Sequence, residues 1–405
     1  MRILALSSWW PEPADNGARL RVSNLLRALA REHEIHLVAF TQGPADEIQR
    51  VQTEQICASV RAVPQRNRRP RHRDRLVSLI HPEPASVRAT WNTAFAASVQ
   101  ERAAAIQPDL VITFALAAAP YARLIIGVPR VMEELELTYM LEQYTRQART
   151  LDRMRFWLTW MKHRRYITRL LAAFDACTVV SAQELRYAQQ LAPATMPLAV
   201  IPNGADVDGC AGPWSEPQPD TLIYPGALSF DANHHAMTYF LRDIFPLIRS
   251  ARPNTLLRIT GKAEPEQQKS LPATDGVEFT GFVPDVRPVV ASSWAEVVPL
   301  RKGGGTRLKI LEALALGTPI VSTSKGVEGL ELEHGKHLFV ADSVDDFAAA
   351  TLLLLDQPEL RKTLVKAGQQ AVRERYDWRV IGQGLNDSLY VVAHNKGLHH
   401  VERAA

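Results

Sequence analysis

The sequence predicts an α/β protein built from two domains, each with a parallel sheet between helices. Short β-rich runs alternate with helical patterns along the whole chain. Several of these runs, such as 109–114, are almost continuously apolar, as strands buried on both faces of a parallel sheet are. The length of 405 residues exceeds what one ordinary hydrophobic core holds and suits two domains.

Each predicted element follows from its local pattern. Strands are expected where apolar runs are short, and helices where apolar residues recur every three or four positions. The predicted strands are 2–7, 34–40, 109–114, 175–180, 198–201, 221–225, 255–260, 294–298, 319–323 and 337–340. The predicted helices are 17–31, 90–106, 151–173, 233–250, 306–316, 343–355 and 358–375.

The best boundary between the domains follows the sequence IPNG at 201–204. The chain then passes through 205–220, which has three prolines and little periodicity. We therefore expect an N-terminal domain over 1–204, a linker over 205–220 and a C-terminal domain over 221–376. A ligand is expected beyond the carboxyl ends of the strands, in a cleft between the domains.

Composition excludes several classes of protein. A hydrophobic content of 46% and a charged content of 22% are those of a folded globular protein. The three cysteines, Cys57, Cys177 and Cys210, are far apart, so we expect no disulfide framework, no metal site and a reducing, cytoplasmic compartment. The N-terminal apolar run is too short for a signal peptide, and no segment approaches the roughly 20 apolar residues of a transmembrane helix.

Positive charge is concentrated in the first half of the chain. Residues 1–200 hold 26 Lys+Arg against 18 Asp+Glu, and two clusters, 66–75 and 146–169, account for most of the excess. Each cluster alone is typical of a solvated surface. Together they predict contact with an anionic membrane surface, because the second interleaves its cations with aromatic residues. No recognised nucleic-acid-binding motif accompanies the charge, so nucleic acid is not expected as a partner.

The most informative passage is GGGTRLK at 303–309, where three glycines run into a helical pattern. The first turn of the predicted helix carries two cations and no carboxylate, although helix N-termini already bear a partial positive charge. A bound anion would relieve this repulsion, and glycines let a phosphate approach free backbone N–H groups. We therefore predict a site for the diphosphate of a nucleotide, formed by Gly304, Gly305, Thr306, Arg307 and Lys309.

A second glycine turn precedes the first predicted helix. Gly17 follows Asp15-Asn16, and Arg19 and Arg21 lie in the first turns of the helix. Alone, this pattern is typical of a plain strand–turn–helix connection with both arginines in solvent. Because it would face the first anion site if the two domains oppose each other, Gly17 and Arg19 join the candidate phosphate ligands.

Glu312 stands three residues after Lys309, on the same side of the predicted helix. A carboxylate there can accept hydrogen bonds from both hydroxyls of a ribose while the cations hold the phosphates. The alternative is a helix-stabilising pair between Lys309 and Glu312, worth about 0.2–0.5 kcal/mol. That pair would explain neither the three glycines nor Arg307.

The stretch GGTRLKILEALALGTPIVST at 304–323 resembles the donor-site signature of family 4 glycosyltransferases. Other segments are similar to further motifs of that family, in the same order: 179–181, 200–206, 224–228, 281–286 and 375–378. The GTR-LKILEA form is similar to the branch that makes exopolysaccharides and other bacterial surface glycans. The resemblance implies the GT-B fold, with two facing Rossmann-like domains and a last helix, over 377–405, that returns to the N-terminal domain.

The resemblance also implies an activity. Family members transfer a sugar from a nucleotide diphosphate donor with retention of configuration, usually without a metal ion, and no cofactor is expected. Glu312 matches the glutamate that binds the donor ribose, and Gly17 matches the glycine loop near the donor phosphates. Lys262 is a further candidate phosphate ligand, and Val283 lies in the loop that often contacts the base. The family's other glutamate, which contacts the donor sugar, would fall on Gly304 and is absent.

Many family members carry a cleft histidine at the position of Leu135, within PRVMEELE at 129–136. Glu133, Glu134 or Glu136 would take over its polar role, and Glu134 and Glu136 are the candidate catalytic residues. Carboxylates this close repel one another, and burial would raise a pKa, as acid–base chemistry requires. The alternative is a solvated helix start, where acids are also favoured. Both interpretations remain open.

The leading hypothesis is a retaining glycosyltransferase that acts on a glycan or polyprenyl-linked acceptor at the inner face of the cytoplasmic membrane. The competing hypothesis is a non-catalytic or partner-dependent relative that only binds nucleotide sugar or glycan. The glutamate missing at Gly304 and the apolar Leu135 favour this alternative. A nucleotide-sugar epimerase on the same fold is the third hypothesis.

Overall fold

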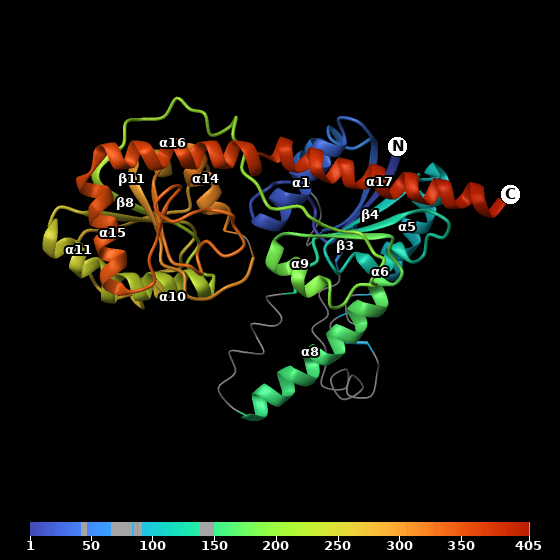
Figure 1. Ribbon diagram of the computed structural model, residues 1–405, viewed down its shortest axis with the longest axis horizontal. Coiled ribbons are helices and arrows are strands. Elements are labelled where there is room, and N and C mark those ends of the chain that lie inside the picture. The colour runs from blue at the N-terminus through green and yellow to red at the C-terminus, as the bar shows by residue number, and fades with distance from the viewer. Residues whose placement is uncertain are drawn as a thin grey trace. The chain divides into compact units, whose positions relative to one another are not determined.

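The computed structural model describes residues 1–41, 47–65, 83–84, 87, 91–137, 150–305 and 307–404. The described chain forms two compact units, each with its own parallel sheet and its own helices (Figure 1). The first unit comprises Met1–Pro202 and Ile381–Ala405, and the second comprises Asn203–Val380. The residues expected as a linker therefore fall within the second unit.

The sheet of the first unit has its described strands in the order β3-β2-β1-β4-β5-β6-β7, all parallel. They are β1 (Arg2–Ser7), β2 (Glu34–Thr41), β3 (Ser59–Pro64), β4 (Leu110–Phe114), β5 (Arg130–Glu133), β6 (Ala176–Val179) and β7 (Leu198–Val200). Strand β4 is buried along its whole length, as its continuous apolar sequence predicts. The strand order reverses between β1 and β4, which is the doubly wound arrangement.

The described helices of the first unit connect the strands of this sheet. They are α1 (Gly17–Leu29), α2 (Glu47–Glu54), α5 (Thr93–Ile106), α6 (Ala119–Ala122), α8 (Thr150–Leu171) and α9 (Ala182–Ala188). Helix α1 begins where the Asn16 side chain accepts a hydrogen bond from the N–H of Arg19 at 3.2 Å. The last helix, α17 (Trp378–Ala404), contributes its later part to this unit, where His33 Nε2 lies 2.5 Å from Asn386 Oδ1.

The sheet of the second unit has its described strands in the order β10-β9-β8-β11-β12-β13, again all parallel. They are β8 (Gln218–Pro225), β9 (Leu256–Thr260), β10 (Val277–Gly281), β11 (Ser293–Val298), β12 (Ile320–Ser322) and β13 (Phe339–Val340). The order reverses between β8 and β11, where Glu296 pairs with Ile223. Doubly wound sheets bind ligands beyond the carboxyl ends of the strands at this reversal point.

Helices of the second unit connect these strands. They are α10 (Asp231–Tyr239), the π-helix η1 (Phe240–Ile244), α11 (Phe245–Ala251), α12 (Pro265–Lys269), α13 (Arg287–Ala291), α14 (Leu308–Leu316), α15 (Val344–Asp356) and α16 (Pro358–Arg375). Helix α14 buries most of its apolar residues and ends at Gly317, whose φ of 83° closes the helix in the left-handed conformation. This helix follows the glycine loop and positions the candidate site.

Every predicted strand overlaps a strand of the structure, but β3, β5 and β10 lie outside the predicted set. Strand β3 has half its residues exposed at the edge of the sheet, and β5 has only four residues. Neither gives the apolar run on which the prediction depended. The helix expected to begin at 306 begins at Leu308, because Arg307 has a non-helical ψ of 84°.

Candidate functional site

The glycine loop lies where the strand order of the second unit reverses. It follows β11 and leads into α14, while Gly226 stands directly after β8. Gly226 approaches α14 so closely that a Cβ on it would lie 2.8 Å from Lys309 Nζ. Any larger residue would therefore push the lysine away. The two loops meet at the edge of the sheet where doubly wound folds bind their ligands.

The backbone of the loop requires glycine at two positions. Gly303 and Gly305 have φ values of 111° and 78°, which other residues rarely adopt. The guanidinium of Arg307 folds back onto this loop and donates to the carbonyl of Gly303 at 2.7 Å and to that of Gly304. Arg307 therefore braces the loop, a contact that the sequence did not predict. Thr306, another predicted phosphate ligand, lies outside the described residues.

Lys309 is a buried cation without a hydrogen-bonded anion. Its Nζ lies 3.9 Å from the centre of the Tyr224 ring, at the end of β8. Among the described residues no acceptor lies within hydrogen-bond distance of Nζ, so the alternative pair with Glu312 is not formed. Burial lowers the pKa of Lys309 to about 8, with a further lowering by Arg307, although Glu296 and Glu312 favour the charged form. An anion brought to this ammonium would restore its charge.

Glu312 lies one turn further along α14 and is half-buried. Burial raises its pKa to about 6, against the opposing effects of Lys309 and Arg287. The carboxylate is therefore mostly ionised at neutral pH and can accept hydrogen bonds. Arg287 is itself held by Asp285, whose Oδ1 lies 2.8 Å from its Nε. The structure thus brings Glu312 and Lys309 together at one edge of the sheet.

Glu296 is a residue of this site that the sequence did not single out. It is fully buried on β11, and in the described part of the chain neither carboxyl oxygen has a hydrogen-bond partner. Burial raises the pKa of Glu296 well above its ordinary value, Lys309 opposes that effect, and Glu312 adds to it. A lone glutamate within the apolar run 294–298 is the signal that could have found it, because Glu is almost never fully buried unless paired.

Lys262 and Val283 lie on the loops after β9 and β10. Lys262 is exposed and Val283 is half-buried. Backbone hydrogen bonds of 2.8 and 2.9 Å join the loops after β8, β9 and β10. The structure therefore places both residues at the same edge of the sheet as Lys309.

Gly17 and Arg19 lie in the first unit, at the start of α1. Gly17 is exposed as the first residue of the helix. Arg19 is partly buried, and its Nη1 lies 3.2 Å from Asp15 Oδ1, so its charge is already partly neutralised within its own turn. The contacts of Arg19 suit the alternative of a plain strand–turn–helix connection. The contacts of Arg21 do not.

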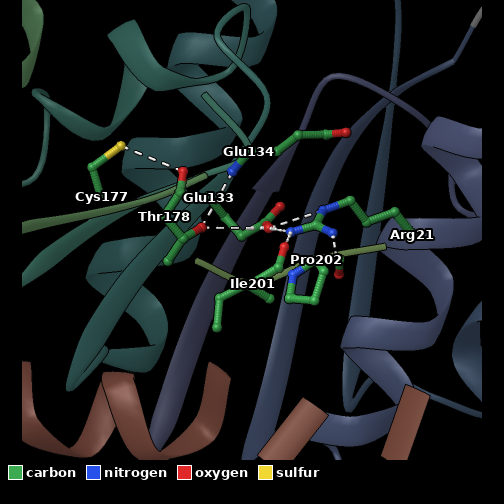
Figure 2. A network of polar contacts seen from close by, with 7 residues as sticks. All are labelled: Arg21, Glu133, Glu134, Cys177, Thr178, Ile201 and Pro202. Carbon is green, nitrogen blue, oxygen red and sulfur yellow. Dashed lines mark hydrogen bonds and ion pairs between the residues drawn. The ribbon is translucent and has the colours of Figure 1, made fainter. Parts of the chain in front are cut away.

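Arg21 is fully buried and forms an ion pair with Glu133, at the end of β5 (Figure 2). Its Nε donates to Glu133 Oε1 at 3.0 Å, and its Nη2 donates to the same oxygen. Nη1 donates to the carbonyl of Pro202 at 2.9 Å, and Nη2 donates to that of Ile201 at 2.7 Å. The alternative of a solvated arginine is wrong for Arg21, because this side chain is buried against Glu133. The sequence could not show this, since Glu133 is distant along the chain.

Glu134 follows this ion pair directly and has two unusual properties. Its φ of 63° is left-handed, which for a residue other than glycine costs about 1–3 kcal/mol. Burial raises its pKa to about 8, Arg21 opposes the rise, and Glu133 and Glu136 add to it. The Glu134 side chain is half-buried and makes none of the contacts drawn in Figure 2, in which only the backbone N–H of Glu134 takes part. A carboxyl group with this pKa can exchange a proton near neutral pH.

The neighbours of Glu134 differ from one another. Leu135 is fully buried in the hydrophobic core, so the position that resembles the family's histidine presents no polar group. Glu136 is exposed. Segment 130–133 is strand β5, so the alternative of a solvated helix start is wrong.

The structure describes most of the second basic cluster but none of the first. Cluster 66–75 lies outside the described residues, as does the beginning of 146–169. The described part of the second cluster is α8, which extends from the sheet of its unit (Figure 1). Met154, Trp157 and Leu158 are exposed on this helix at helical spacing. Across the described residues, no helix has both the length and the apolar character needed to span a membrane.

Family models match two parts of the chain. Residues 15–208 match Glycosyltransferase Family 4, and residues 219–357 match Glycosyl transferases group 1. The first match ends close to the point where the chain leaves the first unit, and the second covers Gly226 and the helix α14 with Lys309 and Glu312.

Two curated relatives match part of the chain. The GDP-mannose-dependent monoacylated alpha-(1-6)-phosphatidylinositol monomannoside mannosyltransferase of Corynebacterium glutamicum is 29% identical over 156 residues, which are 36% of this chain and 41% of that protein. An uncharacterised 44.6 kDa protein in the cps region of Klebsiella pneumoniae is 23% identical over 164 residues, 38% of this chain and 42% of that protein. The matches thus span about two fifths of the length of these relatives.

Solved structures share the fold over almost the whole chain. HepE from Anabaena, in complex with UDP and glucose, has a TM-score of 0.66 at 17% identity and covers 96% of this chain and 100% of its own. Sucrose-phosphate synthase from Thermosynechococcus elongatus has a TM-score of 0.66 at 17% identity, with 97% and 99% covered. The predicted fold class, GT-B with two Rossmann-like parallel-sheet domains, is confirmed.

Proposed function

The chain belongs to the group 1 glycosyltransferases of family 4, and from that premise we propose that it transfers a sugar from a nucleoside diphosphate sugar to a glycan or lipid-linked acceptor. The observation that carries this proposal is the Lys309 ammonium. It is buried over the Tyr224 ring, beside a glycine loop, and lacks a hydrogen-bond acceptor among the described residues. Doubly wound sheets bind their ligands at this edge, and a buried cation there favours an anionic ligand such as a diphosphate.

The proposed reaction breaks the bond between the anomeric carbon and the diphosphate oxygen. Negative charge then develops on the leaving diphosphate, and Lys309 stabilises it together with the backbone N–H groups at the start of α14. Arg307 braces the glycine loop around the phosphates through the carbonyl groups of Gly303 and Gly304. Glu312, ionised at neutral pH, accepts hydrogen bonds from the ribose hydroxyls.

Glu134 is proposed to take the proton from the acceptor hydroxyl as that hydroxyl attacks the anomeric carbon from the same face that the diphosphate leaves, which retains the configuration. Its raised pKa of about 8 supports this role, because a general base works best when its pKa lies near the pH of the reaction. Only the ionised carboxylate can accept the proton. The transfer rate should therefore rise as pH increases through about 8, and Glu134→Gln should abolish that dependence.

Retention of configuration and independence from metal ions are part of the same proposal. The resemblance of 304–323 to the family's donor-site signature supports both. The anomeric configuration of the product, read by NMR coupling constants, tests the first. Equal rates with and without EDTA are expected for the second, and a rate lost in EDTA and restored by Mg²⁺ or Mn²⁺ would contradict it.

The proposal is tested with the purified full chain and a panel of UDP- and GDP-sugars. Released UDP or GDP is measured, because hydrolysis of the donor reports the site even without an acceptor. We expect release from at least one donor, and a loss of that release in Lys309→Met but not in Lys362→Met. Lys362 is a matched control, since it is an exposed lysine of the same unit, paired with Glu359 at 2.8 Å.

A non-catalytic relative that binds nucleotide sugar is the second candidate, and the burial of Leu135 favours it. The two functions predict different results in the same assay. Binding of a donor, seen as a rise in melting temperature, without release or transfer in any condition would support the second candidate. Release of nucleotide with a dependence on Glu134 would exclude it.

We further propose that the acceptor belongs to a bacterial surface glycan and is reached at the inner face of the cytoplasmic membrane. The exposed apolar residues of α8 support membrane contact, together with the exposed Arg164, Arg165 and Arg169 on the same helix. Sedimentation with phosphatidylglycerol vesicles should exceed that with phosphatidylcholine vesicles. Trp157→Glu should abolish it, and equal sedimentation of this variant would contradict the membrane contact.

A further inference from the structure

Arg21 is the largest fully buried side chain of the described protein, and it joins three segments of the first unit. It comes from α1, contacts Glu133 at the end of β5, and donates to two consecutive carbonyl groups after β7 (Figure 2). Those carbonyls belong to Ile201 and Pro202, and the second unit begins at the next residue, Asn203. Arg21 therefore fixes the point at which the chain leaves the first unit.

The same network fixes the backbone of Glu134. The N–H of Glu134 lies 3.4 Å from Thr178 Oγ1, and this hydroxyl lies 3.5 Å from Glu133 Oε1. The next N–H, from Leu135, donates to the Thr178 carbonyl at 3.1 Å. A left-handed φ at a residue other than glycine persists only when its surroundings determine it, and these contacts are those surroundings.

The charged groups of this network also change the pKa of the Glu134 carboxyl group. The described charged groups that act on Glu134 are Arg21 from α1, Glu133 from β5 and Glu136 from the segment after β5. Cys177 on β6 also lies close to Glu133, but burial raises the pKa of its thiol far above neutral, so it carries no charge. Arg21 is thus the cation that opposes two carboxylates beside Glu134.

We infer that the Arg21–Glu133 pair is a positioning pair that orients Glu134 for proton transfer and ties it to the segment through which the chain enters the second unit. The inference rests on the proposed function, in which Glu134 takes the acceptor proton. Neither Arg21 nor Glu133 touches the substrates in this account. Arg21 holds Glu133 and the carbonyls of Ile201 and Pro202 in place, and Glu133 and Thr178 hold Glu134.

Two substitutions test the pair. Glu133→Gln keeps the shape but removes one negative charge beside Glu134, while Arg21 stays. The pKa of Glu134 should then fall, so the rise of kcat/KM with pH should move to lower pH by about one unit. Arg21→Lys keeps the charge but loses the planar fork that reaches three acceptors. We expect at least a tenfold loss of kcat with the donor KM within twofold of the wild-type value.

Arg27→Lys is the matched control, because Arg27 also lies on α1 but pairs with Glu12 at 2.9 Å and is half-exposed. It should leave kcat and the pH profile unchanged. Circular dichroism establishes that each variant is folded, and if Arg21→Lys does not fold, the pH profile of Glu133→Gln decides alone. A purely structural pair would change stability without moving that profile.

The outcomes separate this inference from the proposed function. If Glu134→Gln transfers sugar at the wild-type rate, the catalytic role proposed for Glu134 is wrong. If Glu134→Gln is inactive but Glu133→Gln keeps the wild-type pH profile, the proposed function stands and the positioning pair is overturned. A profile shifted to lower pH in Glu133→Gln and a reduced kcat in Arg21→Lys would support the inference.

Discussion

Arg21 and Lys309 are both buried cations near the N-terminal ends of helices that begin at or soon after a glycine, yet their surroundings are opposite. Arg21 donates hydrogen bonds to a carboxylate and two backbone carbonyls. Lys309 has an aromatic ring beneath it and no hydrogen-bond acceptor among the described residues. A buried cation whose donors are satisfied holds the fold together, whereas one that lacks an acceptor is suited to a ligand.

The pKa values of Arg21 and Lys309 shift in opposite directions, in keeping with these surroundings. Burial lowers the pKa of Arg21, but Glu133, Glu134 and Glu136 raise it more, so the net change is upward. Burial lowers the pKa of Lys309 to about 8, and the neighbouring carboxyl groups do not compensate. The first unit thus stabilises its cation within the protein, whereas the described groups of the second unit do not fully compensate for the burial of Lys309.

Removing Arg21 should have the largest effect on stability. Arg21→Met leaves the buried Glu133 without its partner, and breaking a buried ion pair from one side costs about 3–5 kcal/mol. Urea unfolding followed by circular dichroism measures this loss. The double variant Arg21→Met/Glu133→Leu should be less destabilised than Arg21→Met, because no unpaired charge remains. A loss below about 1 kcal/mol in the single variant would contradict the comparison.

Substitution of Glu312 should have an intermediate effect, confined to the donor. Hydrogen bonds to a charged group are worth about 1.5–3 kcal/mol, so Glu312→Gln should raise the donor KM roughly 10- to 100-fold with a smaller change in kcat. The wild-type affinity should also fall as pH decreases through about 6, where Glu312 takes up a proton. Steady-state kinetics at several pH values measure both effects, and an unchanged KM would remove Glu312 from the ribose site.

The smallest predicted effect is the alkaline pH dependence of stability that Lys309 produces. Its folded pKa of about 8 lies below its ordinary value of 10.5, so the unfolded chain binds more protons between these pH values. The free energy of unfolding should therefore rise with pH over this range, by about 1 kcal/mol for the first pH unit above 8. Lys309→Met should lack this rise. An identical pH dependence in both proteins would place the lysine in solvent.

The sequence predicted those features that depend on neighbouring residues. Apolar runs identified β4 and β11, and the glycines with two cations identified the loop before α14. It could not show that Arg21 is buried, because Glu133 lies 112 positions away and the pairing follows only from the strand order. Strand β5, with four residues and a terminal glutamate, lacked the apolar run that would have predicted it.

In the second unit, too, the sequence predicted what depends on neighbouring residues but not what depends on distant ones. Lys309 was predicted from the glycines and cations at the start of the helix, and Glu312 from its spacing to Lys309, but the sequence did not show that Lys309 lies over the Tyr224 ring and near the buried Glu296. Tyr224 lies on β8 and Glu296 on β11, which are distant in the sequence from one another. Local pattern thus indicated Lys309 and Glu312 as candidates, whereas the surroundings of both, Glu296 among them, follow only from tertiary packing.

Calorimetric titration of UDP and of GDP into the wild-type protein and into Lys309→Met tests whether Lys309 binds the donor diphosphate. We expect at least one nucleotide to bind the wild-type protein and Lys309→Met to weaken this binding at least 100-fold. The ligand-free variant should melt at a higher temperature, because a buried unpaired charge is gone. Equal affinity in the two proteins, or a lower melting temperature with unchanged affinity, would show that Lys309 supports the fold rather than the donor diphosphate.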